Sequence, residues 1–420
     1  MSQTLVGTSP MSITASTTIA GSSGTTETSP LLLALLPITS AVFIVFFVIG
    51  MAMPVLPLHI HERLGLGAFV VGLVAGSQFA ASLVSRFWAG HSADSRGSKR
   101  AMLIGMATAA LAGVVYLLSL PLIQMPGMSA TVLLAGRGVL GAAESFVITG
   151  ALSWGLALGG PAKAGKVIAW LGLPMYAAFA IGAPVGSWLY AQAGFGGIAL
   201  ATLIAPLAGL LLIAPLTPLA PSLAERPSPR SIVGAVAVPG LGLALSSVGF
   251  GAVTIFISLL FAGRGWPQAW LAFTALGVLF ILARVVFGHL PDRLGGTRVA
   301  LLSVAVEALG LALIWLAPAP LWAFVGAGLT GFGYSLVYPS FGVEAVRRAP
   351  AESRGLVMGA YTACLDLGLG IAGPTLGIIA AHGGNTSVFL VSAVVVLMAA
   401  GVALALGRRP TAIRSPSQGA

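Results

Sequence analysis

The segment Arg86–Leu103, RFWAGHSADSRGSKRAML, occurs a second time along the chain as Arg284–Leu301, RVVFGHLPDRLGGTRVAL. Seven positions are identical at one offset of 198 residues: Arg86/Arg284, Gly90/Gly288, His91/His289, Asp94/Asp292, Gly97/Gly295, Arg100/Arg298 and Leu103/Leu301. Each copy joins one long apolar segment to the next. A duplication of this kind predicts a membrane protein built of two related halves that move against each other.

The composition excludes a soluble globular protein. Hydrophobic residues make up 57% of the chain and charged residues only 7%, so a soluble fold would expose far more apolar surface than water tolerates. The single cysteine, Cys364, lies in an apolar run, which excludes an intrachain disulfide and a metal or redox centre built on cysteines. We expect the lipid bilayer as the surroundings, and neither a metal nor a cofactor.

From Leu31 onward, apolar stretches follow one another, each near the roughly 20 residues that cross a hydrocarbon core of about 30 Å. Backbone groups in hydrocarbon must bond within their own segment, so each stretch is predicted to be a helix. The fold class is therefore an all-α membrane protein with twelve transmembrane helices in two pseudo-symmetric six-helix bundles. The predicted helices are 31–57, 67–90, 101–120, 129–154, 167–193, 196–217, 232–262, 268–289, 299–317, 320–342, 356–381 and 387–407.

Composition also marks the segments around the bundles. Residues 218–231, PLAPSLAERPSPRS, contain four prolines and are predicted to link the bundle 31–217 to the bundle 232–407 on the cytoplasmic side. Residues 1–30 are rich in Ser, Thr and Gly and lack the basic start and cleavage site of a secretory signal. We expect them to form a disordered cytoplasmic tail, with residues 408–420 as a second cytoplasmic tail.

The basic residues predict the orientation in the inner membrane. With both termini in the cytoplasm, the outer loops hold only Arg63 and Arg264. The cytoplasmic connections and the C-terminal tail then hold Arg96, Lys99, Arg100, Lys163, Lys166, Arg226, Arg230, Arg293, Arg298, Arg347, Arg348, Arg354, Arg408, Arg409 and Arg414. This bias accounts for the net charge of +10, so nucleic acid is not expected as a partner.

The two copies of the repeat carry a family resemblance. GHSADSRGSKR at Gly90–Arg100 and GHLPDRLGGTR at Gly288–Arg298 resemble the loop 2–3 and loop 8–9 signature of the major facilitator superfamily. PVLPLHIHERLG at 54–65 and VGLVAGSQFAASLVSRFWAG at 71–90 are similar to the YhhS-type group of bacterial members. The resemblance covers residues 31 to 407 and implies a secondary transporter that works by alternating access.

Acidic residues in the repeated loops are candidates for a cytoplasmic gate. An acid at a helix end can interact with basic groups, or with the positive N-terminus of a helix, in the other half. The resemblance implies that Asp94 and Asp292 hold the cytoplasmic side closed in the outward-open state, although Ser95 stands where the family usually has a basic residue. The alternative is that both loops are tight turns with interfacial charges. The predicted gate comprises Gly90, Asp94, Arg96, Gly288, Asp292 and Arg293.

One helix, 129–154, carries ionisable residues within the membrane. Arg137, Gly141 and Glu144 are spaced i, i+4 and i+7, so they share one helix face, and the arginine and glycine resemble a family motif of this helix. A charge at mid-membrane costs about 2.5–3.5 kcal/mol on insertion scales, so this face is expected to line the interior. Glu144 with Arg137 is a proton-coupling candidate. The alternative is an Arg/Glu set that only ties helices together.

Asp366 in the predicted helix 356–381 makes a parallel case. It shares a stripe with Gly370, Gly373 and Gly377, and these small residues allow another helix to pack closely beside the acid. A carboxyl group in such a place can take up and release protons, which is the chemistry that a proton antiporter needs. Asp366 is therefore a second proton-coupling candidate.

Other ionisable residues allow more than one interpretation. Glu307 lies nearer the cytoplasmic side, and we interpret it as structural, with Arg284 as an available partner. His59 and His61, at the outer end of the first helix, are either gating or pH-sensing groups or passive interfacial residues. Their roles stay open at this stage.

A second offset, 190, relates later parts of the halves: Gly141/Gly331, Ser145/Ser335, Gly165/Gly355 and Pro184/Pro374. The motif around Pro184, with Gly182 and Gly186, resembles the one that antiporters of the superfamily carry in helix 167–193. It departs from the family pattern at Ala183 and Ser187, where glycines are usual. The motif favours efflux, and an ordinary kinked packing helix is the alternative.

These observations predict a transporter, not an enzyme. No HExxH or GxSxG pattern is present. We expect proton-coupled efflux of a small neutral or amphipathic solute, of drug or sugar type, by a protein that works as a monomer. The alternatives are an uptake symporter or uniporter of the same fold, or a membrane sensor without transport. The expected substrate-cavity residues are Gln78, Trp154, Tyr176, Tyr334, Tyr338 and Tyr361.

Overall fold

The computed structural model describes residues 28–160, 164–218, 229–349 and 354–408, which are largely helical. The long helices are α1 (Thr28–Leu58), α2 (Ala68–Arg96), α3 (Ser98–Ser119), α4 (Pro126–Gly159), α5 (Ala164–Ile213), α6 (Pro229–Arg264), α7 (Trp270–Phe287), α9 (Gly296–Leu316), α10 (Pro320–Arg347), α11 (Arg354–Gly383) and α12 (Asn385–Arg408). Short helices are η1 (His59–Arg63), η2 (Leu120–Leu122) and α8 (Leu290–Leu294). Nearly all of both expected tails and most of the expected linker lie outside the described residues, as do Lys163, Arg226, Arg409 and Arg414.

Eleven of the described helices are long and apolar enough to cross a membrane, and α5 is two helices in one. Its backbone leaves the helical conformation at Gly194, where φ is 60° and ψ is −159°. A residue with a side chain is strained at such angles, whereas glycine is not. The turn falls between the predicted helices 167–193 and 196–217. The chain therefore makes the twelve predicted crossings.

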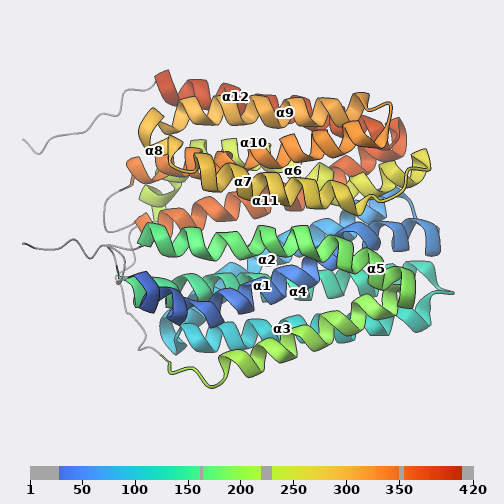
Figure 1. Ribbon diagram of the computed structural model, residues 1–420, viewed down its shortest axis with the longest axis horizontal. Helices are drawn as coiled ribbons and strands as arrows, with labels where there is room; N and C mark the ends of the chain where they lie inside the picture. Colours follow the sequence, from blue (N-terminus) through green and yellow to red (C-terminus); the bar gives the residue numbers. More distant parts are fainter. Residues whose placement is uncertain (1–27, 161–163, 219–228, 350–353, 409–420) are drawn as a thin grey trace, which may run out of the picture.

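The crossings form two six-helix bundles, and this confirms the predicted fold class. In Figure 1 the bundle of α1 to α5 is the lower half and the bundle of α6 to α12 is the upper half. The halves meet where α2 packs on α11, α5 on α7, and α1 on α6. Because the duplication relates α2 to α7 and α5 to α11, the first two of these contacts are equivalent.

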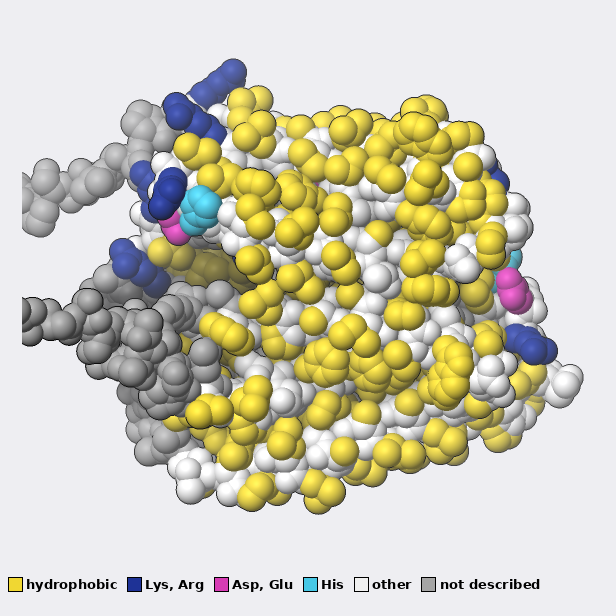
Figure 2. All heavy atoms as spheres, in the orientation of Figure 1, with side chains coloured by type: hydrophobic (Ala, Val, Ile, Leu, Met, Phe, Trp, Pro, Cys, Tyr) yellow, Lys and Arg dark blue, Asp and Glu magenta, His cyan; other side chains and the backbone are white. Residues whose placement is uncertain are grey.

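The charged side chains gather at the two ends of the molecule, and an apolar belt lies between them (Figure 2). Both ends of the described chain, Thr28 and Arg408, lie at the same end as the two repeated loops (Figure 1). We call this the basic end, because most of the described Lys and Arg residues lie there, and we call the other, which carries η1 and Arg264, the far end. Between the halves, the surface is hollowed at the basic end (Figure 2).

The two repeated loops have the same backbone. Gly97 has φ 90° and ψ 150°, and Gly295 has φ 89° and ψ 140°. Both values require glycine, which explains why this position is identical in the two copies. The residues before Gly97 differ from the expectation, because α2 continues to Arg96 instead of ending near residue 90. In the second copy, Asp292 lies in the separate short helix α8.

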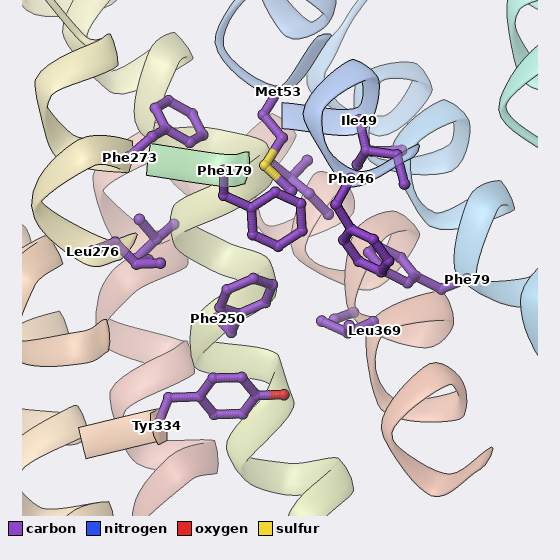
Figure 3. Close-up of a cluster of buried hydrophobic side chains, with 14 of the residues drawn as sticks. Phe46, Ile49, Met53, Phe79, Phe179, Phe250, Phe273, Leu276, Tyr334 and Leu369 are labelled. Atoms are coloured by element: carbon purple, nitrogen blue, oxygen red, sulfur yellow. The ribbon is translucent and has the colours of Figure 1, made fainter. Parts of the chain in front are cut away.

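The halves touch most closely toward the far end. A Cβ added to Gly72 or Gly76 of α2 would collide with the backbone of Gly373 or Gly370 of α11, so the two backbones are in contact. Beside this crossing, aromatic rings continue the core across the interface (Figure 3). Phe179 of α5 lies 6.3 Å from Phe250 of α6, measured between ring centroids. The two halves are thus in direct contact at these places.

A glycine within the first bundle gives a direct test of this packing. A Cβ at Gly141 of α4 would collide with the carbonyl oxygen of Gln78 in α2, whereas one at Gly138 would meet only Ala81 at 3.7 Å. We expect Gly141→Ala to lower stability by about 1–3 kcal/mol, the usual cost of overpacking. The measurement is the midpoint of thermal unfolding in detergent, with Gly138→Ala as the matched control. Equal midpoints for the two variants would contradict the close α2–α4 packing.

Candidate functional site

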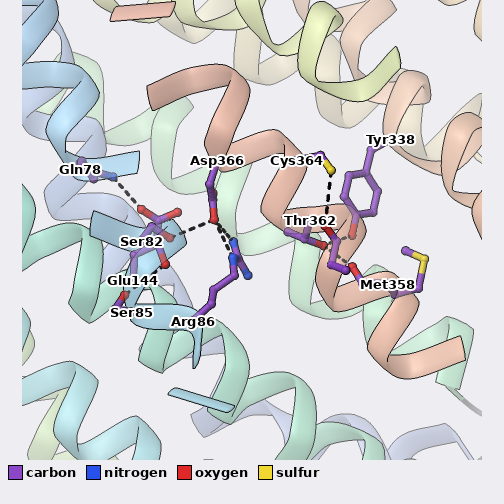
Figure 4. A network of polar contacts seen from close by, with 11 residues as sticks. Gln78, Ser82, Ser85, Arg86, Glu144, Tyr338, Met358, Thr362, Cys364 and Asp366 are labelled. Atoms are coloured by element: carbon purple, nitrogen blue, oxygen red, sulfur yellow. Dashed lines mark hydrogen bonds and ion pairs between the residues drawn. The ribbon is translucent and has the colours of Figure 1, made fainter. Parts of the chain in front are cut away.

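An ion pair joins the two halves in the middle of the molecule. Asp366 of α11 is 1% exposed, and Arg86 of α2 donates to its Oδ2 from Nη2 at 2.5 Å and from Nε at 2.6 Å. Ser82, one turn before Arg86, donates from Oγ to the same oxygen at 3.3 Å. Figure 4 shows these three side chains converging from the two helices. One buried carboxylate from the second half is therefore held entirely by residues of the first half.

Local sequence explains why the pair forms here. Ser82 and Arg86 are spaced i and i+4, so they share one face of α2. On α11, Gly370 and Gly373 follow Asp366 along the stripe that the sequence predicts, and both lie against α2. The absence of side chains on these glycines lets the helices approach closely enough for the short Asp366 side chain to reach Arg86.

A second carboxyl group lies beside this pair. Glu144 of α4 accepts a hydrogen bond at 2.7 Å on Oε2 from Nε2 of Gln78, which is 1% exposed. Glu144 is within electrostatic range of both Asp366 and Arg86, and Figure 4 shows it next to them. The structure thus brings together the two proton-coupling candidates that the sequence places on different helices of different halves.

Arg137 lies within electrostatic range of Glu144 but is not bonded to it. It is 4% exposed, and its Nε and Nη1 have no hydrogen-bond partner among the described residues. Neither a hydrogen bond nor an ion pair links it to Glu144, although the two share a face of α4. The alternative interpretation is that Arg137 and Glu144 only hold helices together. A bond between helices does exist here, but it joins Glu144 of α4 to Gln78 of α2 and does not involve Arg137.

The expected pairing of Glu307 with Arg284 is wrong. Glu307 of α9 is fully buried and accepts a hydrogen bond from Ser246 of α6, inside the second bundle. Arg284, in the last turn of α7, has no carboxylate partner among the described residues, and its guanidinium lies 5.5 Å from the ring centroid of Phe280. Glu307 thus bonds within its own bundle, and its structural role stays a prediction.

Four of the predicted cavity residues surround Arg284. Tyr176, Tyr334, Tyr338 and Tyr361 all lie within electrostatic range of its guanidinium. Tyr176 of α5 stacks on Phe280 with ring centroids 3.2 Å apart, and Tyr338 of α10 lies 5.2 Å from Tyr361 of α11. The other two predicted cavity residues lie elsewhere: Gln78 bonds Glu144, and Trp154 is 2% exposed within the apolar core.

The comparisons with known proteins agree with this architecture. The sequence model of the Major Facilitator Superfamily matches residues 38–296 and 240–420. The chain belongs to the major facilitator superfamily. An uncharacterized MFS-type transporter of Burkholderia pseudomallei is 44% identical over 377 residues, covering 89% of this chain and 91% of the relative. One from Pseudomonas aeruginosa is 42% identical over 367 residues, covering 87% and 91%.

The fold is also that of solved members of the superfamily. The crystal structure of a D-xylose-proton symporter is similar with a TM-score of 0.71 at 14% identity, and the match covers 90% of this chain and 97% of that one. At this level of identity the likeness concerns the fold alone. The finer resemblance to the YhhS-type group stays a prediction.

The predicted gate residues of this major facilitator protein lie at the basic end. Asp94, Arg96, Asp292 and Arg293 are exposed there, in the two repeated loops. Gly90 and Gly288 lie one turn earlier, and a Cβ on Gly288 would collide with the Arg284 carbonyl oxygen, whereas Gly90 has open space around it. The residues lie at the same end of the molecule as the two described chain ends. The side of the membrane and the gating role stay predictions.

The antiporter-like motif lies inside the first bundle. A Cβ on Gly182 or Gly186 of α5 would collide with the backbone of α1 near Met51, and Pro184 lies between them within α5. These glycines therefore let α5 pack closely on α1. Such packing is what the alternative interpretation, a kinked packing helix, requires.

The two outer histidines have structural contacts. His59 is 3% exposed and stacks on Phe195 with ring centroids 4.4 Å apart, and Nδ1 of His61 lies 3.0 Å from the Leu66 carbonyl oxygen. Among the described residues, no group of three or more His, Cys, Asp or Glu side chains is arranged to hold a metal ion.

Sequence reasoning missed Arg86 and Ser82 as members of the site. The available signal was a basic residue inside an apolar segment that also matches Arg284 in the repeat. A charge in that position needs a partner, but the partner lies 280 positions away along the chain. Only the packing of α2 on α11 identifies it.

The ion pair makes a specific prediction about stability. Arg86→Gln leaves the buried Asp366 carboxylate without a cation, and we expect a loss of about 3–5 kcal/mol. Adding Asp366→Asn removes the unpaired charge, so the double variant should recover much of that loss. The measurement is thermal unfolding in detergent, with Arg100→Gln, an exposed arginine at the basic end, as the control. A double variant no more stable than Arg86→Gln would show that the two side chains do not act as a pair.

Proposed function

We propose that this protein is a proton-coupled secondary transporter that moves a small neutral or amphipathic solute, of drug or sugar type, out of the cell by alternating access. The observation that carries the proposal is the ion pair between Arg86 and Asp366, which spans the two halves with Glu144 beside it. Ionisable groups within a membrane are expensive and mark ion pathways in transporters. In this protein Arg86 and Asp366 also lie at the interface between the two halves, which would separate during alternating access.

The geometry suggests how a proton controls the contact. While Asp366 is ionised, Arg86 and Ser82 hold it and α2 stays joined to α11. A proton on Asp366 removes the negative charge, so Arg86 loses its ionic partner and the crossing is weakened. Glu144 is close enough for Arg86 to balance its charge instead, with Gln78 as the hydrogen-bond donor that positions it. Protonation is thereby coupled to the joining and separation of the halves.

The proposed direction of transport follows from a sequence motif and not from the ion pair. Efflux rests on the resemblance of Gly182, Pro184 and Gly186 to the antiporter motif. Uptake by a symporter or uniporter of the same fold would use the same contacts in the other direction. Accumulation in inverted vesicles but not in right-side-out vesicles supports efflux, and the reverse supports uptake. A sensor would bind a solute without any flux.

The coupling role of Asp366 can be tested in proteoliposomes with an imposed pH gradient. A solute panel is screened for flux, and proton movement is followed at the same time with a pH-sensitive dye. We expect Asp366→Asn to abolish solute-dependent proton movement, because the amide cannot carry the proton. Glu62→Gln, at an exposed acid on the far end, serves as the control. Transport by Asp366→Asn with unchanged pH dependence would remove Asp366 from the coupling role.

We further propose that the protein lies in the inner membrane with the basic end, and so both termini, in the cytoplasm, and that it works as a monomer. The excess of Lys and Arg at that end supports this orientation. The solute and protons are its expected partners, and we propose no enzymatic activity.

The orientation can be mapped with single cysteines in a Cys364→Ser background. We expect an impermeant maleimide to label His61→Cys from outside intact cells, and to reach Ser95→Cys and His289→Cys only after the cells are opened. All three positions are exposed. Labelling of positions 95 and 289 from opposite sides would contradict the duplicated arrangement.

A further inference from the structure

The duplication relates the ion-pair site to a second place in the molecule. At the offset of 198, Ser82 and Arg86 of α2 are equivalent to Phe280 and Arg284 of α7. At the offset of 190, Tyr176 of α5 is equivalent to Asp366 of α11, and Glu144 of α4 is equivalent to Tyr334 of α10. The second place is therefore the region where α7 packs on α5.

Observed contacts confirm that the two places correspond. Gly76 lies against the carbonyl oxygen of Gly370, and the equivalent Thr274 donates from Oγ1 to the carbonyl oxygen of Ala180 at 2.9 Å. Six residues further along α2, Ser82 donates to Asp366 at 3.3 Å. The equivalent contact is the stack of Phe280 on Tyr176, 3.2 Å between ring centroids. The α2–α11 and α7–α5 crossings thus share one register.

The two places differ in their charge. At the first, the guanidinium of Arg86 has two carboxyl groups around it, Asp366 and Glu144. At the second, tyrosines stand at both equivalent positions, and Arg284 has no carboxylate among the described residues. The sequence suggests Glu307 as a partner for Arg284, but Glu307 accepts a hydrogen bond from Ser246 instead. An arginine within a membrane helix without a counter-charge is costly, and such a residue is by default part of a functional site.

The groups around Arg284 are suited to an organic anion. Three of the tyrosine hydroxyls are already engaged: Tyr334 with Ser247 at 3.0 Å, Tyr338 with Thr362 at 2.8 Å, and Tyr361 with the Tyr338 carbonyl oxygen at 2.8 Å.

The Tyr176 hydroxyl has no hydrogen-bond partner among the described residues, and the side chains of Tyr176 and Arg284 are both partly exposed. An uncommitted hydroxyl and a forked cation, next to aromatic faces, match an oxyanion attached to an apolar body.

We propose that Arg284 and Tyr176 bind an acidic group of the transported solute, a carboxylate or similar oxyanion on an aromatic or amphipathic body. The solute supplies the negative charge that Asp366 and Glu144 supply at the symmetry-related site. This assignment rests on the proposed transport function and narrows its substrate class, from neutral or amphipathic solutes to amphipathic anions.

The test measures binding, so it does not depend on proton coupling. Phenylacetate and naphthoate are each compared with the matching amide, phenylacetamide or naphthamide, at millimolar concentration. The readout is the midpoint of thermal unfolding of the full-length protein in neutral detergent. We expect the carboxylates, and not the amides, to raise the midpoint of the wild-type protein. In Arg284→Gln, binding of the carboxylates should be about tenfold to a hundredfold weaker, as expected for loss of a charged hydrogen bond.

Two variants keep the result interpretable. Arg284→Lys retains the charge and should retain part of the carboxylate shift, which shows that a charge and not only folding is lost in Arg284→Gln. Arg408→Gln, an exposed arginine at the end of α12, should behave as the wild type. The readout needs neither a pH gradient nor solute flux, so a failure of proton coupling is distinguishable from a failure of this proposal.

Several outcomes would overturn the proposal. They are equal shifts with carboxylates and amides, no shift with either carboxylate, or a full carboxylate shift in Arg284→Gln. An anionic lipid headgroup has the same chemistry as the acidic solute, so phosphatidylglycerol is tested in parallel. If that lipid, and neither carboxylate, gives the shift that depends on Arg284, the site binds lipid and the assignment to a transported solute is wrong.

Discussion

A buried charge must be compensated in a low-dielectric environment, and this constraint organises the whole interface between the halves. Asp366 is almost inaccessible, so it depends on Arg86 and Ser82, which lie on the opposite half. The second half therefore does not satisfy this carboxylate with residues of its own. In the proposed function, the association of the bundles depends on the protonation of this single carboxyl group, which is what a transporter driven by protons requires.

The duplication gives each half the same framework and a different chemistry. The crossings α2–α11 and α7–α5 share a register, yet acids occupy one site and tyrosines the other. In the proposed function, this division lets one site handle protons while the other recognises a solute. Because both sites lie on the interface between the halves, alternating access would make a change at Arg86 and a change at Arg284 act on one conformational equilibrium.

Much of this architecture is readable from the sequence because membrane helices are specified locally. The apolar lengths give the twelve crossings, and even the turn at Gly194 falls between two predicted helices. Acids inside apolar segments single out Glu144 and Asp366, since such residues are rarely placed there without a role. The four tyrosines around Arg284 are also among the residues that the sequence nominates.

What the sequence does not specify is which side chains meet. The partner of Asp366 is Arg86, which lies in the other half of the protein. The partner of Glu307 is Ser246 of α6, and not Arg284, which the position of Glu307 along its helix suggests. Both choices depend on helix rotation and crossing angle, which no local pattern encodes. Trp154 is nominated as an aromatic residue near the cavity, yet the rotation of α4 turns it into the apolar core.

The glycine contacts between α2 and α11 determine how closely the halves approach each other. Gly72 and Gly373 place two backbones directly against each other. At these positions the halves are as near as backbones can come, so a larger side chain at either glycine would wedge them apart. The hydrogen atoms of these glycines therefore set the spacing of the two helices, and with it the reach of Asp366 toward Arg86 farther along the same crossing.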